Sequence, residues 1–118
     1  MGASVMTYPC YVVLSPSGWP DCLKTEEGMA VCVFTDEQLA GRYCEAKRRA
    51  IRQRTGEDVR DFHLIGFEHP EALLAAFHKA APDLAEKGVE GVAVDPNDTL
   101  HARQILLTDF LEDVKRSL

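Results

Sequence analysis

The stretch VCVFTDEQLAGRYCEAKRRAIRQR, residues 31–54, contains the sharpest change of character in the chain. An apolar run over residues 29–34 ends at Phe34, and a polar segment dense in arginine follows. Runs of β-branched and aromatic residues are typical of strands, and this run is long enough for a buried one. The stretch therefore predicts a strand that turns directly into a helix.

The helix is expected over residues 36–54. Thr35 is the predicted N-cap, because Gln38 stands three residues later and completes the spacing of a capping box. Asp36 then lies in the first turn, where the helix dipole favours negative charge. Gly56 is the expected stop, since glycine readily adopts the left-handed conformation that ends many helices.

Two faces of this helix differ in character when its residues are spaced at about 100° each. The apolar face is predicted to contain Leu39, Ala40, Tyr43, Cys44, Ala50 and Ile51. The opposite face carries Arg42, Arg48, Arg49 and Arg52, with Glu45 among them as a partner for Arg49. Lys47 falls within the apolar face, so either its ammonium group reaches outward past the edge of the sheet or the inner face is narrower than this set of residues.

The rest of the chain alternates short strands and helices. Glycine, proline and acidic turn residues separate the apolar runs. The second helix is expected to begin at Pro70 and either to end at Pro82 or to bend there, with a further turn over 82–87 before Gly88. The expected strands cover 8–14, 22–25, 29–34, 61–67, 89–94 and 103–107, and a last helix capped by Thr108 covers 109–118. Within 61–67, Phe62 and Leu64 are expected on one side and His63 and Ile65 on the other.

These elements predict one domain over residues 1–118. Neighbouring strands at the start and end are expected to be antiparallel, whereas the strand–helix–strand steps in the middle imply crossovers. The expected fold is α+β (an α/β sandwich): a mixed sheet of about five to six strands, with two longer helices and a C-terminal helix packed on it.

Composition agrees with a soluble globular domain. The chain has 118 residues, of which 46% are hydrophobic and 27% charged. Its longest apolar runs are about six residues, far below the roughly 20 that a membrane span requires. Residues 1–20 lack the basic start and apolar core of a secretory signal. A cytoplasmic location without a membrane partner is therefore expected.

Charge is distributed unevenly. The net charge is −6, yet residues 42–60 contain seven basic and three acidic side chains. An acidic protein repels nucleic acid overall, so such binding would have to be local to this segment. Its arginines also lack the alternating aromatic residues that stack on bases. The arginine face is thus predicted to be a solvated helix face or a surface for a protein partner, with anion or nucleic-acid binding as the alternative.

Cysteines and histidines supply no recognisable catalytic motif. Cys10 and Cys32 fall in strands and are expected to be buried free thiols. No pair of cysteines has the C-x-x-C spacing of zinc or redox sites. Cys44 or Cys22 could serve a small cysteine-dependent enzyme, which remains a second alternative.

Of the histidines, His78 is expected to be partly buried and His69 to precede the second helix. A metal site built from His63, His101 and a cysteine is conceivable but is not adopted, so neither metal nor cofactor is predicted. Trp19, in the loop 15–22, is expected to plug the core. A place in a binding surface is its alternative role.

Three short segments together are similar to a known family. They are YVVLS at 11–15, VFTDEQLAGRY at 33–43, and GVAVDP at 91–96, which is followed by a strand and a terminal helix. With the order of elements over residues 8–118, they resemble the N-terminal domain of the bacterial SseB-like family, named for enhanced serine sensitivity. The resemblance implies an α/β sandwich without established enzymatic activity, and it supplies no catalytic residues.

The sequence thus predicts a non-enzymatic cytoplasmic interaction module that binds a protein partner or self-associates into a homo-oligomer. The predicted partner-binding residues are Arg42, Arg48, Arg49, Arg52 and Trp19.

Overall fold

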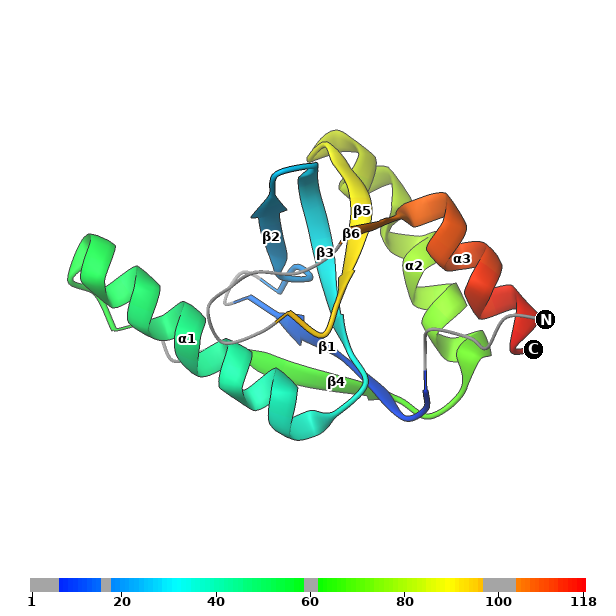
Figure 1. Cartoon of the computed structure of the whole chain (residues 1–118), viewed down its shortest axis with the longest axis horizontal. Coiled ribbons are helices and arrows are strands. Elements are labelled where there is room, and N and C mark those ends of the chain that lie inside the picture. The colour runs from blue at the N-terminus through cyan, green and yellow to red at the C-terminus, as the bar shows by residue number, and fades with distance from the viewer. Residues whose placement is uncertain (1–6, 16–17, 59–61, 97–103) are drawn as a thin grey trace.

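A computed structural model describes residues 7–15, 18–58, 62–96 and 104–118 of the chain. Within these residues, six strands form one mixed sheet, and three helices pack on it (Figure 1). This architecture confirms the predicted fold class. In chain order the elements are β1 (Cys10–Leu14), β2 (Cys22–Thr25), β3 (Gly28–Phe34), α1 (Glu37–Thr55), β4 (His63–Phe67), α2 (Pro70–Glu86), β5 (Val89–Val94), β6 (Gln104–Leu106) and α3 (Leu107–Arg116).

The strand order across the sheet is β4-β1-β3-β5-β6, and β2 also pairs with β3. The pair of β3 and β5 is parallel, and the other pairs are antiparallel. A parallel pair needs a long connection, which the chain between Phe34 and Val89 supplies. The topology places β4 at one edge of the sheet.

Strands β1 and β2 lie along the same side of β3 and are separated by the connecting segment 15–21, here called the excursion. Tyr11 of β1 pairs with Phe34 near one end of β3, and Cys22 of β2 pairs with Val31 further along. The excursion closes where the N–H of Asp21 donates to the carbonyl oxygen of Val13 at 2.8 Å.

Trp19 lies in this excursion and is 40% exposed, so the prediction that it plugs the core is wrong. Trp19 lies in a turn beyond the end of β1, where its carbonyl oxygen accepts from the N–H of Ser15 at 2.8 Å and the neighbouring Pro20 forms a bridge with Leu14. The ammonium nitrogen of Lys87 stands 4.3 Å from the centre of the Trp19 ring.

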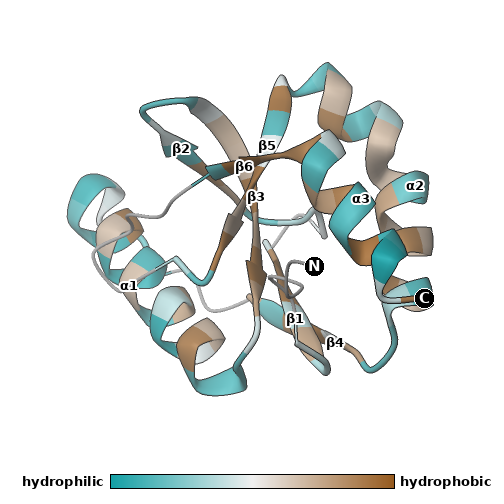
Figure 2. Cartoon of the chain, turned by 45° about the vertical axis from the view of Figure 1, so that its right-hand side comes forward, coloured by the Kyte–Doolittle hydropathy of each residue, from teal (hydrophilic) through white to brown (hydrophobic). Residues whose placement is uncertain are grey.

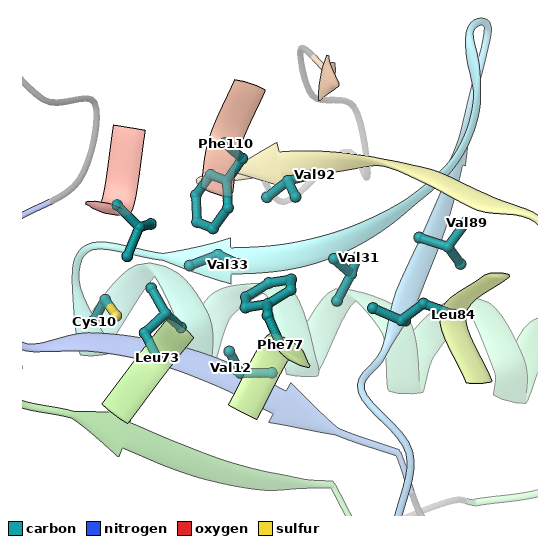
Figure 3. Packing of buried hydrophobic residues seen from close by; sticks show 11 residues of the cluster. Cys10, Val12, Val31, Val33, Leu73, Phe77, Leu84, Val89, Val92 and Phe110 are labelled. Atoms are coloured by element: carbon teal, nitrogen blue, oxygen red, sulfur yellow. The ribbon is translucent and has the colours of Figure 1, made fainter. Parts of the chain in front are cut away.

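Two apolar cores lie on opposite faces of the sheet. One forms between the sheet and helices α2 and α3, where Phe77 lies among Val12, Val31 and Val33 (Figure 3). The ring centroids of Phe77 and Phe110 are 5.4 Å apart, which joins α2 to α3. The strands at the centre are hydrophobic, whereas the helices carry hydrophilic residues on their outer sides (Figure 2).

The other core forms between the sheet and α1. Its buried members are Val13, Leu23, Ala30, Cys32, Phe34, Ala40, Tyr43 and Ala93. Only the first part of α1 covers the sheet, and the C-terminal part projects away from the body of the protein (Figure 1). Ala50 and Ile51, which were expected to face inward, are therefore only half-buried.

The N-cap of α1 is Asp36 rather than the predicted Thr35. An Asp36 carboxylate oxygen accepts from the N–H groups of Gln38 and Leu39, at 2.7 and 3.2 Å. Thr35 is instead held by Asp95, whose two carboxylate oxygens accept from its N–H at 2.8 Å and its hydroxyl at 2.6 Å. The parallel pairing of β3 and β5 brings their ends together and places Asp95 beside Thr35. Gly56, with φ 76°, ends the helix as predicted.

Several local predictions at the other helices are wrong. His78, expected to be partly buried, is exposed on the outer side of α2, whereas Pro82 lies inside that helix, which continues to Glu86. Helix α3 begins at Leu107, so Thr108 lies inside the helix instead of capping it. The last helix was expected to include Leu118, but this residue lies beyond the end of α3 and is 62% exposed.

His69 is confirmed as the residue that precedes α2. Most of the segment between the expected strands 89–94 and 103–107 lies outside the described residues. No helix within the described ranges is long and apolar enough to cross a lipid bilayer.

Candidate interaction surfaces

Strand β4 is an edge strand with little protection. It pairs with β1, and among the described residues no strand pairs with its other side. Leu64 is 39% and Ile65 38% exposed. Natural edge strands are usually guarded by charged residues, proline or a bulge, because a bare edge recruits further strands. The sequence of β4, HLIGF, contains no proline and no acidic, lysine or arginine residue, and its pairing with β1 is regular.

The alternation of an antiparallel ladder shows which backbone groups of β4 face outward. The carbonyl oxygen of Val13 accepts from Asp21, so the backbone groups of Val13 face β3 rather than β4. Val12 therefore faces β4 and bonds to its partner Ile65. The N–H and C=O groups of Leu64 and Gly66, the flanking positions, point away from β1, and no strand among the described residues pairs with them.

An apolar groove adjoins this edge on the face that α2 covers. It is a cavity of about 120 Å³ between β1, β4 and α2. Its lining is made of apolar side chains from Val12, Leu14, Pro20, Val31, Ile65, Phe67, Leu73, Ala76, Phe77, Ala80 and Leu84. Sites for small molecules usually measure about 300–1,000 Å³, so the groove suits a single apolar side chain better. Ile65 belongs both to the groove and to the exposed edge.

The predicted arginine face lies on α1, partly on its projecting end (Figure 1). The guanidinium of Arg48 is 3.4 Å from the carboxylate of Glu45 and 3.6 Å from that of Asp58. Glu45 therefore pairs with Arg48 rather than with the expected Arg49. Arg42, Arg49 and Arg52 are exposed, and among the described residues none has an ion-pair partner within 4 Å.

Trp19 does not join the arginines in one patch. It contacts Lys87 directly after α2, and α2 covers the opposite face of the sheet from α1. The predicted partner-binding residues are therefore divided between two regions of the molecule.

A polar cluster lies buried under α1. The hydroxyl of Tyr43 donates to Oδ2 of Asp21 at 2.6 Å, and the thiol of Cys32 donates to the Tyr43 oxygen at 3.4 Å. Lys47 donates to the carbonyl oxygen of Cys22 at 3.2 Å, and its ammonium nitrogen is 3.6 Å from Asp21. The position of Lys47 within the apolar face is thus explained by a buried acid rather than by reach to solvent.

The hydrogen bonds of this cluster link α1 to the sheet and to Asp21, which precedes β2. Burial is the largest cause that raises the pKa of Tyr43, and Cys32 and Asp21 beside it raise that pKa further. A phenol with a raised pKa keeps its proton and remains a hydrogen-bond donor to Asp21.

Burial also raises the pKa of each of the four cysteine thiols. That of Cys10 rises to about 11 and that of Cys32 to about 12, and those of Cys22 and Cys44 rise as well. Cys10 and Cys32 are buried free thiols as predicted, and Cys22 and Cys44 are half-buried. A thiolate nucleophile requires a lowered pKa, so these surroundings weigh against the cysteine-dependent enzyme.

The metal site considered for His63, His101 and a cysteine lies partly outside the described residues, because His101 is not among them. His63 is exposed on β4. The described parts of the chain contain no group of three or more histidine, cysteine or acidic side chains that could hold a metal ion.

Comparison of the sequence with models of known families gives no match, and a search of the curated proteins also finds none. The resemblance to the SseB-like domain therefore stays a prediction.

Sequence reasoning missed the edge of β4 as a candidate interaction surface. It identified the strand and the sides on which His63, Leu64 and Ile65 lie. Whether a strand lies at the edge of a sheet depends on how the other strands are ordered, and no local pattern in HLIGF carries that information.

Proposed function

We propose that this protein is an interaction module that binds an extended polypeptide segment as an additional strand beside β4. The observation that carries the proposal is that two features lie side by side. The backbone groups of Leu64 and Gly66 point outward, and Ile65 between them lines the apolar groove. In strand addition, main-chain hydrogen bonds give affinity and pockets for alternate side chains give specificity.

The chemistry of β4 defines the segment that it would accept. The segment must be extended, because the N–H and C=O groups at Leu64 and Gly66 repeat every second residue. It should carry apolar side chains on the groove side, since a charged group there would lose its hydration without gaining a partner. A free N–H at its bonded positions is also required, which excludes proline there.

A library of random heptapeptides displayed on phage and selected on the immobilised protein tests the proposal. We expect enrichment of peptides with apolar residues at alternate positions. Leu64→Pro should abolish their binding because it removes an outward N–H, whereas Leu64→Ala keeps that group and should retain most of it. Absence of enrichment, or equal binding to both variants, would contradict strand addition.

The groove has its own test on helix α2. Ala76 lines the groove, and its neighbour Ala75 is exposed on the helix. Ala76→Met should fill the cavity and weaken the selected peptides about tenfold or more, while Ala75→Met should leave them unchanged. If the two variants bind equally, the groove is not part of the site.

The arginine face supports a second candidate function, the binding of a polyanion. Arg42, Arg49 and Arg52 are exposed on α1, whereas Arg48 has carboxylates beside it. Phosphate or sulfate contacts from clustered arginines give binding that weakens steeply with salt. The net charge of −6 opposes such binding at longer range, so this function ranks second.

A further inference from the structure

We infer that the segment bound at this edge is β4 of a second copy of the protein, so that the two sheets join into one across a two-fold axis. This inference rests on the proposed function and names the partner of the same site. It is drawn from the sequence and exposure of β4. Two copies of this strand, paired antiparallel, complement each other in backbone groups and in side chains.

The two-fold axis would pass through Ile65. An antiparallel pair centred there matches Leu64 of one copy with Gly66 of the other, and the reverse. These are the residues whose N–H and C=O groups point outward, so each copy satisfies the outward groups of the other. The five residues of β4 are then all paired, with His63 opposite Phe67 and Ile65 opposite itself.

The side chains also fit in this register. On the face that carries α1, the bulky Leu64 would lie opposite Gly66, which has no side chain. On the other face the two Ile65 side chains would meet and cover each other next to the groove. Such cross-strand pairs of apolar residues stabilise a sheet, whereas like charges directly opposite would destabilise it. No pair in this register brings like charges together, because the strand carries no acid, lysine or arginine.

Contact between two copies is symmetric, which is the common arrangement of soluble homo-oligomers. Each chain has a net charge of −6, so two copies repel at long range while their contact strands are neutral. Salt screens repulsion between exposed charges. Added salt should therefore strengthen this dimer, which is opposite to its effect on polyanion binding.

Sedimentation velocity over a range of protein concentrations measures the oligomeric state. We expect the 13.1 kDa chain to pass to a species of about twice that mass as concentration or salt rises. Leu64→Pro should keep the protein monomeric, and Leu64→Ala should shift the equilibrium less. Circular dichroism shows that each variant is folded before its mass is interpreted.

A disulfide test fixes the register. The half-buried Cys22 and Cys44 are first changed to serine, which leaves the buried Cys10 and Cys32. Ile65→Cys should then form a disulfide-linked dimer rapidly on mild oxidation, because residues directly opposite in a pair without hydrogen bonds lie about 4.5 Å apart at Cα. Leu64→Cys is the matched control, and it should link at least tenfold more slowly because Gly66 lies opposite it.

A chain that stays monomeric at high concentration overturns the inference, as do equal rates of linking at the two cysteines. A monomer that still selects displayed peptides, and loses them with Leu64→Pro, would leave the proposed function standing without self-association. A monomer that selects no peptide would overturn both.

Discussion

The hydroxyl of Tyr43 on α1 donates a 2.6 Å hydrogen bond to Asp21, the residue at which the excursion after β1 rejoins the sheet. This contact links two segments that are 22 positions apart in the sequence. The same carboxylate lies 3.6 Å from the ammonium nitrogen of Lys47. A single buried acid therefore contacts two residues of α1, beside the apolar core that packs the same helix on the sheet.

Loss of the Tyr43 hydroxyl should destabilise the protein. Tyr43→Phe keeps the ring but removes the donor, which leaves a buried carboxylate with one fewer partner. We expect the free energy of unfolding, measured in urea, to fall by about 1–3 kcal/mol. Tyr11→Phe is the control: Tyr11 is half-buried, and no hydrogen bond of its hydroxyl is found among the described residues, so its effect should stay within about 0.5 kcal/mol. Equal effects would mean that the bond to Asp21 contributes nothing.

Substitutions at the start of α1 distinguish the effect of its N-cap, Asp36, from that of the hydrogen bonds between Thr35 and Asp95. Asp36→Ala removes the N-cap and should cost about 1 kcal/mol in the free energy of unfolding. Asp95→Ala removes both bonds to Thr35 and places alanine at a φ of 51°, so it should cost more. Asp95→Gly tolerates this φ and loses only the hydrogen bonds, so its loss in the free energy of unfolding should be smaller than that of Asp95→Ala. If Asp95→Gly costs as much, the backbone conformation is not a source of the loss.

The side chain of Gln104 lies over Gly91, where it occupies the space that a Cβ atom would take. Gly91→Ala should displace Gln104 and break its 2.6 Å contact with the hydroxyl of Thr25. We expect a loss of about 1–3 kcal/mol in stability. In a Gln104→Ala background the same change should cost at least about 1 kcal/mol less, because its obstacle is gone. Additive effects in this double-mutant cycle would contradict the close packing.

Stability should fall at alkaline pH because two buried thiols resist ionisation. The pKa of Cys10 rises from 9.0 to about 11, and that of Cys32 from 9.0 to about 12. Above about pH 9 the unfolded chain loses these protons while the folded chain keeps them. The unfolded state then binds fewer protons, so the free energy of unfolding decreases as pH rises. Urea midpoints between pH 8 and 10.5 measure this slope, and Cys32→Ala should make it shallower. An unchanged slope would show that Cys32 does not contribute.

Retention on heparin tests the arginine face. If Arg42, Arg49 and Arg52 bind polyanions, the protein should be held at low salt and released as salt rises. Changing all three to glutamate should abolish retention. The matched control changes Lys24, Lys79 and Arg116, which are exposed on other elements, to glutamate and so alters the net charge equally. Equal losses in the two triple variants would indicate a net-charge effect, and no retention of the native protein would end the hypothesis.

The order of elements could be predicted from the sequence because each one has a local signature. The apolar run that ends at Phe34 and the spaced apolar residues of α2 are properties of single segments. The errors occur where a distant partner decides the outcome. The hydroxyl of Thr35 could cap a helix, but in the structure it donates a hydrogen bond to Asp95 instead. Lys47 appears misplaced on its helix until Asp21 is brought beneath it.

The candidate site depended even more on tertiary structure. The arginine face could be located from helical spacing alone, and the structure leaves three of its members exposed. The edge of β4 could not be located, because its exposure follows from the order of strands in the sheet. Pro20 likewise joins the groove only because the excursion after β1 folds back on the sheet.

That excursion gives the protein an optical reporter of its own. Trp19 is the single tryptophan of the chain, and it directly precedes Pro20, which lines the groove. Its partly exposed indole, with the Lys87 ammonium above the ring, is sensitive to any change in local polarity. The fluorescence emission of the unlabelled protein can therefore be followed as the groove fills, which makes occupancy measurable in a cuvette without an attached dye.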